Sequence, residues 1–355
     1  MRVHQYDSGP KPPADAARQL GGDWSAMISN AAAGYREHYR LLGIDDSVVR
    51  RVAGWSMEAV ARWHQPLADQ LVAMADGAAV PVDQITMLTA RTEILAAADK
   101  SVTGPGECST LVDVAGSIAF QTWDWHPQLV PDALWWRSTT ADGRWVKTFT
   151  EPGMPAKIGL NSAGLSVNFN ILHHATDSAD GGVPVHVIAR RILDEARTVD
   201  DAYALACSAS VSASTVITVL ATGNNSPEAV AIEISPAGVA LVRPTDEWLV
   251  HTNHFLDPGL TAGGVIPPVS TTRRRLDHLV AAQPAATVGL AALAERLCGE
   301  AGEDAPICMQ ADTSLRATEQ WRTLLSVRLE PATGRIEYWP GTPYDASVAG
   351  ACLQF

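Results

Sequence analysis

The spacing of apolar residues first changes from helical to strand-like at the breaker cluster Thr103-Gly104-Pro105-Gly106. Before the cluster, apolar residues recur at helical intervals over residues 14–42, 46–74 and 82–98, which predicts three amphipathic helices. After the cluster, short runs suited to strands begin at Thr110. The sequence therefore predicts a helical first third followed by a β-rich remainder.

The β-rich part is predicted to alternate between sets of strands and pairs of helices. The first strands are expected at 110–114, 117–123, 134–138, 144–149, 157–160 and 165–169, with helices at 184–196 and 199–207. Further strands are expected at 215–220, 229–234, 239–242 and 248–251, helices at 271–282 and 286–297, and a last hairpin at 324–329 and 335–339. This order predicts an α+β fold of four layers, with two antiparallel sheets stacked between helices.

The composition is that of a globular protein and argues against several partners. Of the 355 residues 46% are hydrophobic and 18% are charged, and the formal net charge is −13. Duplex nucleic acid and anionic membranes attract positive surfaces, so we expect neither as a partner. The densest basic run, Arg273-Arg274-Arg275, is expected to be the solvated start of a helix rather than a phosphate site.

The cysteines and the N-terminal residues bear on the compartment. The five cysteines contain no Cys-x-x-Cys pair and are odd in number, which favours neither a disulfide framework nor a structural zinc site. The first residues lack the basic-then-apolar order of a secretory signal, and no apolar run approaches the about 18 residues of a membrane span. The sequence therefore predicts a cytoplasmic protein.

Cys108, in Gly106-Glu107-Cys108-Ser109-Thr110, opens the first predicted strand and is the leading candidate nucleophile. Cleavage of the Glu107–Cys108 bond would free an α-amine that could act as base to the Cys108 thiol. The other four cysteines are expected to be buried, inert side chains.

Two further motifs supply polar groups at predicted strand ends. Asp124 stands between two tryptophans, where it could hold the freed amine of Cys108 or simply open the turn into His126. Asn253, in His251-Thr252-Asn253-His254, could donate a hydrogen bond to an oxyanion. The histidines of this motif and His173-His174 could instead bind a metal, but no pattern of acidic or cysteine ligands completes a site.

Four motifs together resemble a known family. They are Gly106-Glu107-Cys108-Ser109-Thr110, Thr122-Trp123-Asp124-Trp125, Lys157-Ile158-Gly159-Leu160-Asn161-Ser162-Ala163-Gly164-Leu165 and His251-Thr252-Asn253-His254. In this order and at these separations, across nearly the whole chain, they look like the acyl-coenzyme A:6-aminopenicillanate acyltransferase family of N-terminal-nucleophile (Ntn) hydrolases.

The resemblance implies a fold, a processing event and three roles. It implies the αββα sandwich of Ntn hydrolases, made as a precursor that cleaves itself into an α chain of residues 1–107 and a β chain of residues 108–355. Cys108 would be the nucleophile of both cleavage and catalysis, Asp124 would hold its freed amine, and Asn253 would stabilise the oxyanion. The two chains would stay together as a heterodimer, with further homo-oligomerisation left open.

Other candidates are assigned from position. The family usually has an arginine just before the late core strand, for which Arg322 is chosen over Arg316, although either could be a surface arginine. Trp123, Trp125 and His126 could line a substrate pocket. Trp135 and Trp136 could contribute to it, but core packing is the more frequent role of such tryptophans.

The leading hypothesis is an N-terminal-cysteine amide hydrolase or acyltransferase. It would pass an acyl group from a small acylated amine or acyl thioester, through an acyl-cysteine, to water or an amine, without metal or cofactor; a coenzyme A thioester remains open as co-substrate. The alternative is an unprocessed, non-catalytic binding scaffold. A papain-like hydrolase using Cys108 and His254 is disfavoured, because that fold places its cysteine at the start of a helix.

Overall fold

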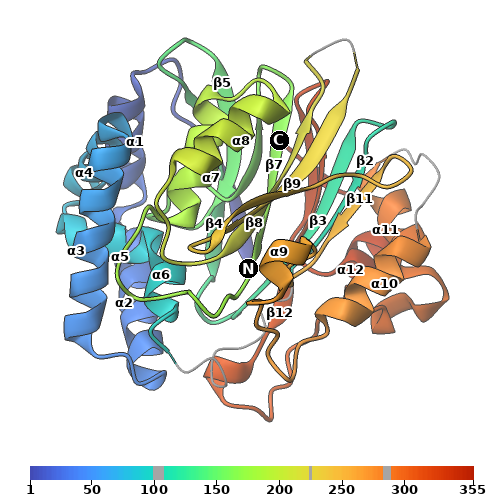
Figure 1. The fold of residues 1–355 in the computed structure, drawn as a ribbon. Helices are drawn as coiled ribbons and strands as arrows, with labels where there is room; N and C mark the ends of the chain where they lie inside the picture. The colour runs from blue at the N-terminus through green and yellow to red at the C-terminus, as the bar shows by residue number, and fades with distance from the viewer. Residues whose placement is uncertain (99–107, 224–225, 283–288) are drawn as a thin grey trace.

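The computed structural model describes residues 1–98, 108–223, 226–282 and 289–355. The breaker cluster at 103–106, Glu107 and the expected helix start at 286–288 lie outside these ranges. The described residues form two sheets, one of eight strands and one of six, with helices on either side (Figure 1). The predicted α+β class is therefore confirmed.

The eight-stranded sheet runs in the order β1-β4-β5-β6-β7-β8-β9-β10. Its strands are β1 (Arg2–Asp7), β4 (Asp132–Thr139), β5 (Trp145–Thr150), β6 (Ile158–Asn161), β7 (Leu165–Ile171), β8 (Thr215–Ala221), β9 (Glu228–Ser235) and β10 (Gly238–Val242). All neighbours are antiparallel except β1, which pairs parallel to β4. The expectation of purely antiparallel sheets is wrong for this edge, because β1 was not recognised as a strand.

The six-stranded sheet runs in the order β11-β2-β3-β12-β13-β14. Its strands are β11 (Trp248–His251), β2 (Ser109–Asp113), β3 (Ile118–Trp125), β12 (Arg322–Glu330), β13 (Arg335–Trp339) and β14 (Leu353–Gln354). It faces the other sheet through β2, whose Thr110 Oγ1 donates to Asn170 Oδ1 on β7 at 2.7 Å. The strands that carry the sequence motifs therefore lie in the middle of the molecule.

Helices cover both outer faces. The outer layer of the eight-stranded sheet includes α7 (Val185–Glu195) and α8 (Val199–Ser208), and that of the six-stranded sheet includes α10 (Thr272–Ala282), α11 (Leu290–Cys298) and α12 (Pro343–Ala349). Leu111 and Phe120, on β2 and β3, pack against Leu279, Leu293 and Leu297 of this second layer. The predicted αββα order is thus present.

The N-terminal third consists of short helices beside the eight-stranded sheet (Figure 1). They are α1 (Pro13–Asp23), α2 (Ser25–Leu41), α3 (Asp46–Trp63), α4 (Gln65–Ala78), α5 (Val82–Thr89) and α6 (Arg91–Leu95). Each of the three long helices expected here is interrupted. Between α3 and α4 the cause is Pro66, which cannot donate the backbone hydrogen bond of a continuous helix, and the His64 side chain caps α4 by accepting from Leu67 N at 3.2 Å.

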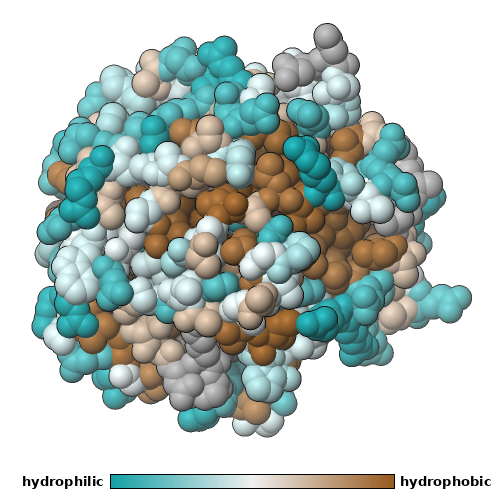
Figure 2. All heavy atoms as spheres, in the orientation of Figure 1, coloured by the Kyte–Doolittle hydropathy of each residue, from teal (hydrophilic) through white to brown (hydrophobic). Residues whose placement is uncertain are grey.

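The outer surface mixes apolar and hydrophilic patches. On the face in Figure 2, apolar side chains gather over the middle and hydrophilic ones around the rim.

No helix within the described ranges is long and apolar enough to cross a membrane.

Helices α1 and α4 approach each other so closely that glycine is required at their contact. A Cβ on Gly77 would lie 1.9 Å from the Arg18 carbonyl oxygen, and one on Gly21 would lie 2.2 Å from the Met74 carbonyl oxygen. Both obstacles are backbone atoms of the facing helix, so neither can move without separating the helices.

We expect Gly77→Ala to lower the free energy of unfolding by about 1–3 kcal/mol because the added methyl group forces the helices apart. The control is Gly54→Ala in α3, where no atom lies within 4 Å of the new Cβ; it should be neutral or stabilising by up to about 1 kcal/mol. Denaturant unfolding measures both. Equal stability of the two variants would contradict the packing described.

Candidate active site

The β2–β3 hairpin brings Cys108 and Asp124 together. Its register pairs Ser109 with Thr122 and Thr110 with Gln121, so Cys108, one residue before β2, lies near the end of β3. A hydrogen bond from the Asp124 backbone reaches the Cys108 thiol. Cys108 is 4% exposed and Asp124 1% exposed. The nucleophile and carboxylate selected from the sequence are thus neighbours in the core.

The environment of Cys108 disfavours the thiolate. Burial raises the pKa of the Cys108 thiol to about 12, and the negative charge of Asp124 acts in the same direction. The cations of Arg275 and Lys157 oppose this increase without cancelling it. At neutral pH the thiol is therefore protonated, so a reaction at this sulfur needs a base.

Arg275 reaches the nucleophile from α10. Its Nη1 donates to the Cys108 carbonyl oxygen at 2.6 Å and to Ser109 Oγ at 2.9 Å, and its Nη2 donates to Asn253 Oδ1 at 3.0 Å. The residue is fully buried, whereas Arg273 and Arg274 are exposed. The expectation that this basic run is solvated is therefore wrong for Arg275.

Asn253 lies just beyond β11 with its amide held on both sides. Its Nδ2 donates to the Ile171 carbonyl oxygen at 2.8 Å, and its Oδ1 accepts from Arg275. Because a guanidinium only donates, this contact fixes which end of the amide is oxygen. One guanidinium therefore joins Asn253 to the backbone of Cys108.

Arg322 does not belong to this group of contacts. It begins β12, opposite Trp125 on β3, and its side chain is exposed. Arg316 is also exposed and pairs with Glu319. Sequence position could instead have singled out Arg275. This arginine shares the buried face of α10 with Thr272 and Leu279 at helical spacing.

The histidines considered as metal ligands or as a base make other contacts. His251 Nε2 lies 2.8 Å from Glu233 Oε1, and His254 Nδ1 lies 2.9 Å from Thr272 Oγ1. Across the described ranges no cluster of His, Cys, Asp and Glu is arranged to hold a metal ion. Cys108 precedes a strand rather than opening a helix, unlike the nucleophile of a papain-like enzyme.

A buried group of charges lies behind the site. Glu151 pairs with Lys157 and with Arg91, whose Nη1 is 2.5 Å from Glu151 Oε1. Lys157 Nζ lies 4.1 Å from the ring centroid of Trp123, and Arg91 Cζ lies 4.0 Å from that of Trp125. Burial, followed by the charge of Arg91, lowers the pKa of Lys157. Trp123 therefore packs against a buried cation.

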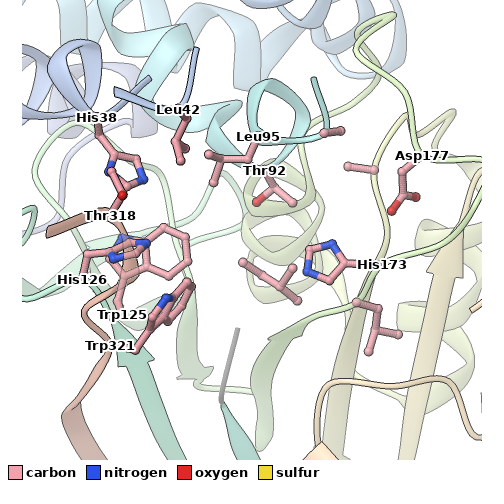
Figure 3. A pocket seen from close by; sticks show the side chains of 14 residues that line it. His38, Leu42, Thr92, Leu95, Trp125, His126, His173, Asp177, Thr318 and Trp321 are labelled. Atoms are coloured by element: carbon pink, nitrogen blue, oxygen red, sulfur yellow. The ribbon is translucent and has the colours of Figure 1, made fainter. Parts of the chain in front are cut away.

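A pocket opens near the end of β3 (Figure 3). Trp125, His126 and Ile171 line it together with His38, Leu95 and Trp321. Trp125 follows Asp124 directly, and Ile171 is the residue that accepts from Asn253. Of the predicted substrate-binding residues, Trp125 and His126 thus border this pocket, whereas Trp123 does not.

The remaining tryptophans and cysteines have structural positions. Trp135 packs on Tyr338 and Phe355, and Trp136 Nε1 donates to Ser8 Oγ at 2.7 Å. Both belong to the core rather than the pocket. Cys298 and Cys308 are buried as expected, but Cys207 is exposed, so that expectation is wrong for Cys207.

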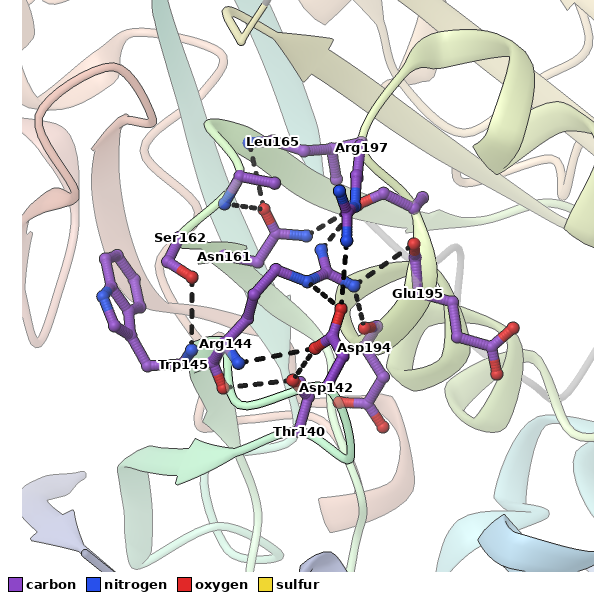
Figure 4. Close-up of polar contacts among 12 residues, drawn as sticks. Thr140, Asp142, Arg144, Trp145, Asn161, Ser162, Leu165, Asp194, Glu195 and Arg197 are labelled. Carbon is purple, nitrogen blue, oxygen red and sulfur yellow. Dashed lines mark hydrogen bonds and ion pairs between the residues drawn. The ribbon is translucent and has the colours of Figure 1, made fainter. Parts of the chain in front are cut away.

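The motif around Asn161 shapes a turn rather than the pocket (Figure 4). Asn161 Nδ2 donates to the Leu193 and Ala196 carbonyl oxygens, both at 2.9 Å, and its Oδ1 accepts from Ala163 N and Leu165 N. Gly164 has φ +80°, which only glycine adopts without strain. The motif therefore fixes the predicted β6–β7 hairpin against the end of α7.

The match to a protein-family model decides the family. The model for acyl-coenzyme A:6-aminopenicillanic acid acyl-transferase matches residues 114–344. The chain belongs to this family. The matched range includes Asp124 and Asn253 and begins after Cys108, so it is narrower than the sequence resemblance indicated.

A curated relative and two solved structures are also similar to the chain. The 40 kDa form of acyl-coenzyme A:6-aminopenicillanic-acid-acyltransferase from Emericella nidulans is 30% identical over 219 residues, which are 60% of this acyltransferase-family chain and 59% of the relative. A mutant conjugated bile acid hydrolase from Clostridium perfringens aligns with a TM-score of 0.42 at 8% identity, over 66% of this chain and 89% of its own. Penicillin V acylase from Agrobacterium tumefaciens aligns with a TM-score of 0.34 at 10% identity, over 66% of this chain and 82% of its own.

Proposed function

We propose that this family member is a self-cleaving N-terminal-cysteine amide hydrolase or acyltransferase that acts on small acylated amines. The observation that carries the proposal is the buried contact of Cys108 with Asp124 at the end of the β2–β3 hairpin. Membership of the acyltransferase family supports the reaction class. The products of cleavage would be residues 1–107 and 108–355.

In the cleavage step, the Cys108 thiol attacks the carbonyl carbon of Glu107, a residue outside the described ranges. The new C–S bond replaces the C–N bond between the two residues, and the leaving amine takes a proton. Water then hydrolyses the thioester, which releases the Glu107 carboxyl group and restores the Cys108 thiol. The chain gains a free α-amine next to that thiol.

In the turnover step, the α-amine removes the thiol proton. The thiol needs this base because its pKa is raised. The buried carboxylate of Asp124 holds the resulting ammonium group. The thiolate attacks the substrate carbonyl, and the leaving amine takes the proton back. An acyl-cysteine remains and passes its acyl group to water or to a second amine.

Asn253 is the oxyanion donor in this scheme. An amide nitrogen carries two N–H groups, and the Ile171 carbonyl oxygen takes one of them. The other is assigned to the substrate oxygen as it becomes negative. Arg275 is a positioning residue, because it fixes the amide through Oδ1 and the nucleophile through its carbonyl oxygen.

The co-substrate follows from the name of the relative. That name pairs acyl-coenzyme A with 6-aminopenicillanic acid, so coenzyme A thioesters and 6-aminopenicillanic acid are the first acyl donors and acceptor to test. Hydrolysis and transfer differ only in which nucleophile meets the acyl-cysteine. The matched region leaves about two-fifths of the relative unaligned, and its pairing of substrates is proposed here for this chain only as a starting point.

The second candidate is an unprocessed binding scaffold of the same fold. It is favoured by one observation: the Cys108 thiol is buried with its pKa raised to about 12, which is the environment of an inert cysteine. The two candidates differ in whether the protein turns over a substrate at Cys108.

We expect Cys108→Ala to abolish hydrolysis of a phenylacetyl amide and of phenylacetyl-coenzyme A, because the acyl group then has no attachment point. The loss in kcat should be on the order of 10⁴-fold or more. Release of amine or of free thiol measures it. Cys207→Ala, at the exposed cysteine, is the control and should keep full activity. A wild-type chain without turnover would favour the scaffold, whereas an active Cys108→Ala variant would contradict the assignment of Cys108 as the nucleophile.

We expect Arg275→Met to lower kcat by roughly 100-fold with little change in KM, because misplacing Asn253 and Cys108 affects the transition state most. Arg275→Lys should recover only part of this, since an ammonium cannot bridge both oxygens. Arg322→Ala is the comparison for the arginine expected from the sequence. Loss of activity in Arg322→Ala with normal activity in Arg275→Met would reverse the assignment.

A further inference from the structure

The pocket at the end of β3, lined by Trp125 and His126, has two imidazoles at one end. His38, from α2, and His126, just after β3, lie with ring centroids 4.6 Å apart, and Figure 3 shows them on one side of the pocket with Trp321. His173 and Asp177 lie on the other side. The apolar walls between the two ends include Leu42, Leu95 and Ile171.

The tautomer of His126 is set by its backbone partner. Nδ1 lies 3.0 Å from the Gln320 carbonyl oxygen, and because a carbonyl only accepts, Nδ1 carries the proton. In the neutral ring Nε2 is then a lone-pair acceptor. An acceptor such as Nε2 in an apolar pocket needs a hydrogen-bond donor as its partner.

Both rings are held neutral. Burial, followed by the charge of His38, lowers the pKa of His126 to about 3, and burial, followed by Arg91, lowers the pKa of His38 to about 4. The His38 ring makes no hydrogen bond to any residue in the described part of the chain, although the residue is only 3% exposed. It therefore offers one N–H donor and one acceptor to whatever occupies the pocket.

Two more polar groups on the pocket lining are without partners. Thr92 Oγ1 and Trp321 Nε1 are buried and make no hydrogen bond with the residues that the structure describes. Buried polar atoms are nearly always hydrogen-bonded in folded proteins. These two residues therefore add polar character to the surroundings of the pocket.

The charge state limits what a ligand in the pocket can carry. Neutral imidazoles offer a hydroxyl group both a donor and an acceptor, which is what a hydroxyl needs. A carboxylate would meet the lone pair of His126 Nε2 without a compensating charge, and an ammonium group would lose its water among aromatic walls. The flat rings of Trp125 and Trp321 suit an aromatic or extended apolar body.

We propose that His38 and His126 form a hydroxyl-binding subsite, which selects acyl groups that have an apolar, preferably aromatic, body and a terminal hydroxyl. That the bound molecule is an acyl group rests on the proposed function; the hydroxyl selectivity rests on the pocket alone. The two histidines thereby become specificity-determining residues.

Binding of two neutral amides by the wild-type protein tests the subsite. Calorimetry compares 4-hydroxyphenylacetamide with phenylacetamide, which differ only in the hydroxyl group. We expect the hydroxylated amide to bind about tenfold more tightly, as two neutral hydrogen bonds allow. His38→Phe is the main variant, because this substitution removes no hydrogen bond within the protein. His126→Phe is the second variant. In each, the preference for the hydroxylated amide should fall to about twofold or less. Cys207→Ala, at an exposed cysteine that does not line the pocket, is the control and should keep the preference.

The subsite would be overturned if the wild-type protein bound the two amides equally, bound phenylacetamide more tightly, or failed to bind the hydroxylated amide. An unchanged preference in both histidine variants would overturn it as well. Turnover distinguishes this failure from failure of the proposed function. If the protein shows the binding preference but cleaves no acyl amide, the subsite stands and the proposed function fails. If it cleaves both amides without preference, the proposed function stands and the subsite fails.

Discussion

The guanidinium of Arg275 joins three segments that are far apart in the sequence. It holds the carbonyl oxygen of Cys108 at the start of β2, the side chain of Ser109, and the amide oxygen of Asn253 beyond β11. A buried cation is tolerated only when its donors are satisfied, so α10, β2 and β11 must meet in one arrangement. In the proposed mechanism, that arrangement also lets Cys108 and Asn253 act on the same substrate carbonyl.

The charges around the site explain why the nucleophile needs a partner. Asp124 disfavours ionisation of the thiol, and the cations of Arg275 and Lys157 only partly compensate. Lys157 is itself tied to Glu151 and stacked on Trp123. In such a low-dielectric region charges act strongly on one another, and a neutral amine created beside the thiol would be the missing base. Cleavage would thus supply the group that the intact chain lacks.

The strands and their hairpins could be predicted because each carries its own local signal. The β6–β7 turn was visible in Asn161 and Gly164, and the placement of Asp124 beside Cys108 followed once two neighbouring strands were taken as a hairpin. β1 was missed because its residues are mixed in polarity and its partner, β4, lies more than a hundred residues away. The breaks in the first helices were missed because helical spacing continues across His64 and Pro66.

The polar contacts of the site were harder to predict. Arg275 stands in a run of three arginines, and only its helical spacing with Thr272 and Leu279 distinguishes the buried one from its exposed neighbours. His126 was selected for its position beside Asp124, but His38 comes from a helix some ninety residues earlier and nothing in its local sequence marks it. Pockets between distant segments are properties of the assembled layers, so a single sequence does not encode them locally.

The central claim is that Cys108 becomes the N-terminal residue of a second chain. Mass spectrometry of the purified protein under denaturing conditions, with N-terminal sequencing of each fragment, tests it most directly. The account predicts two chains that join at Glu107–Cys108, the second beginning with Cys108. A single intact chain under conditions in which the protein turns over its substrate would contradict it, because the thiol would then react without the amine that the mechanism uses as its base.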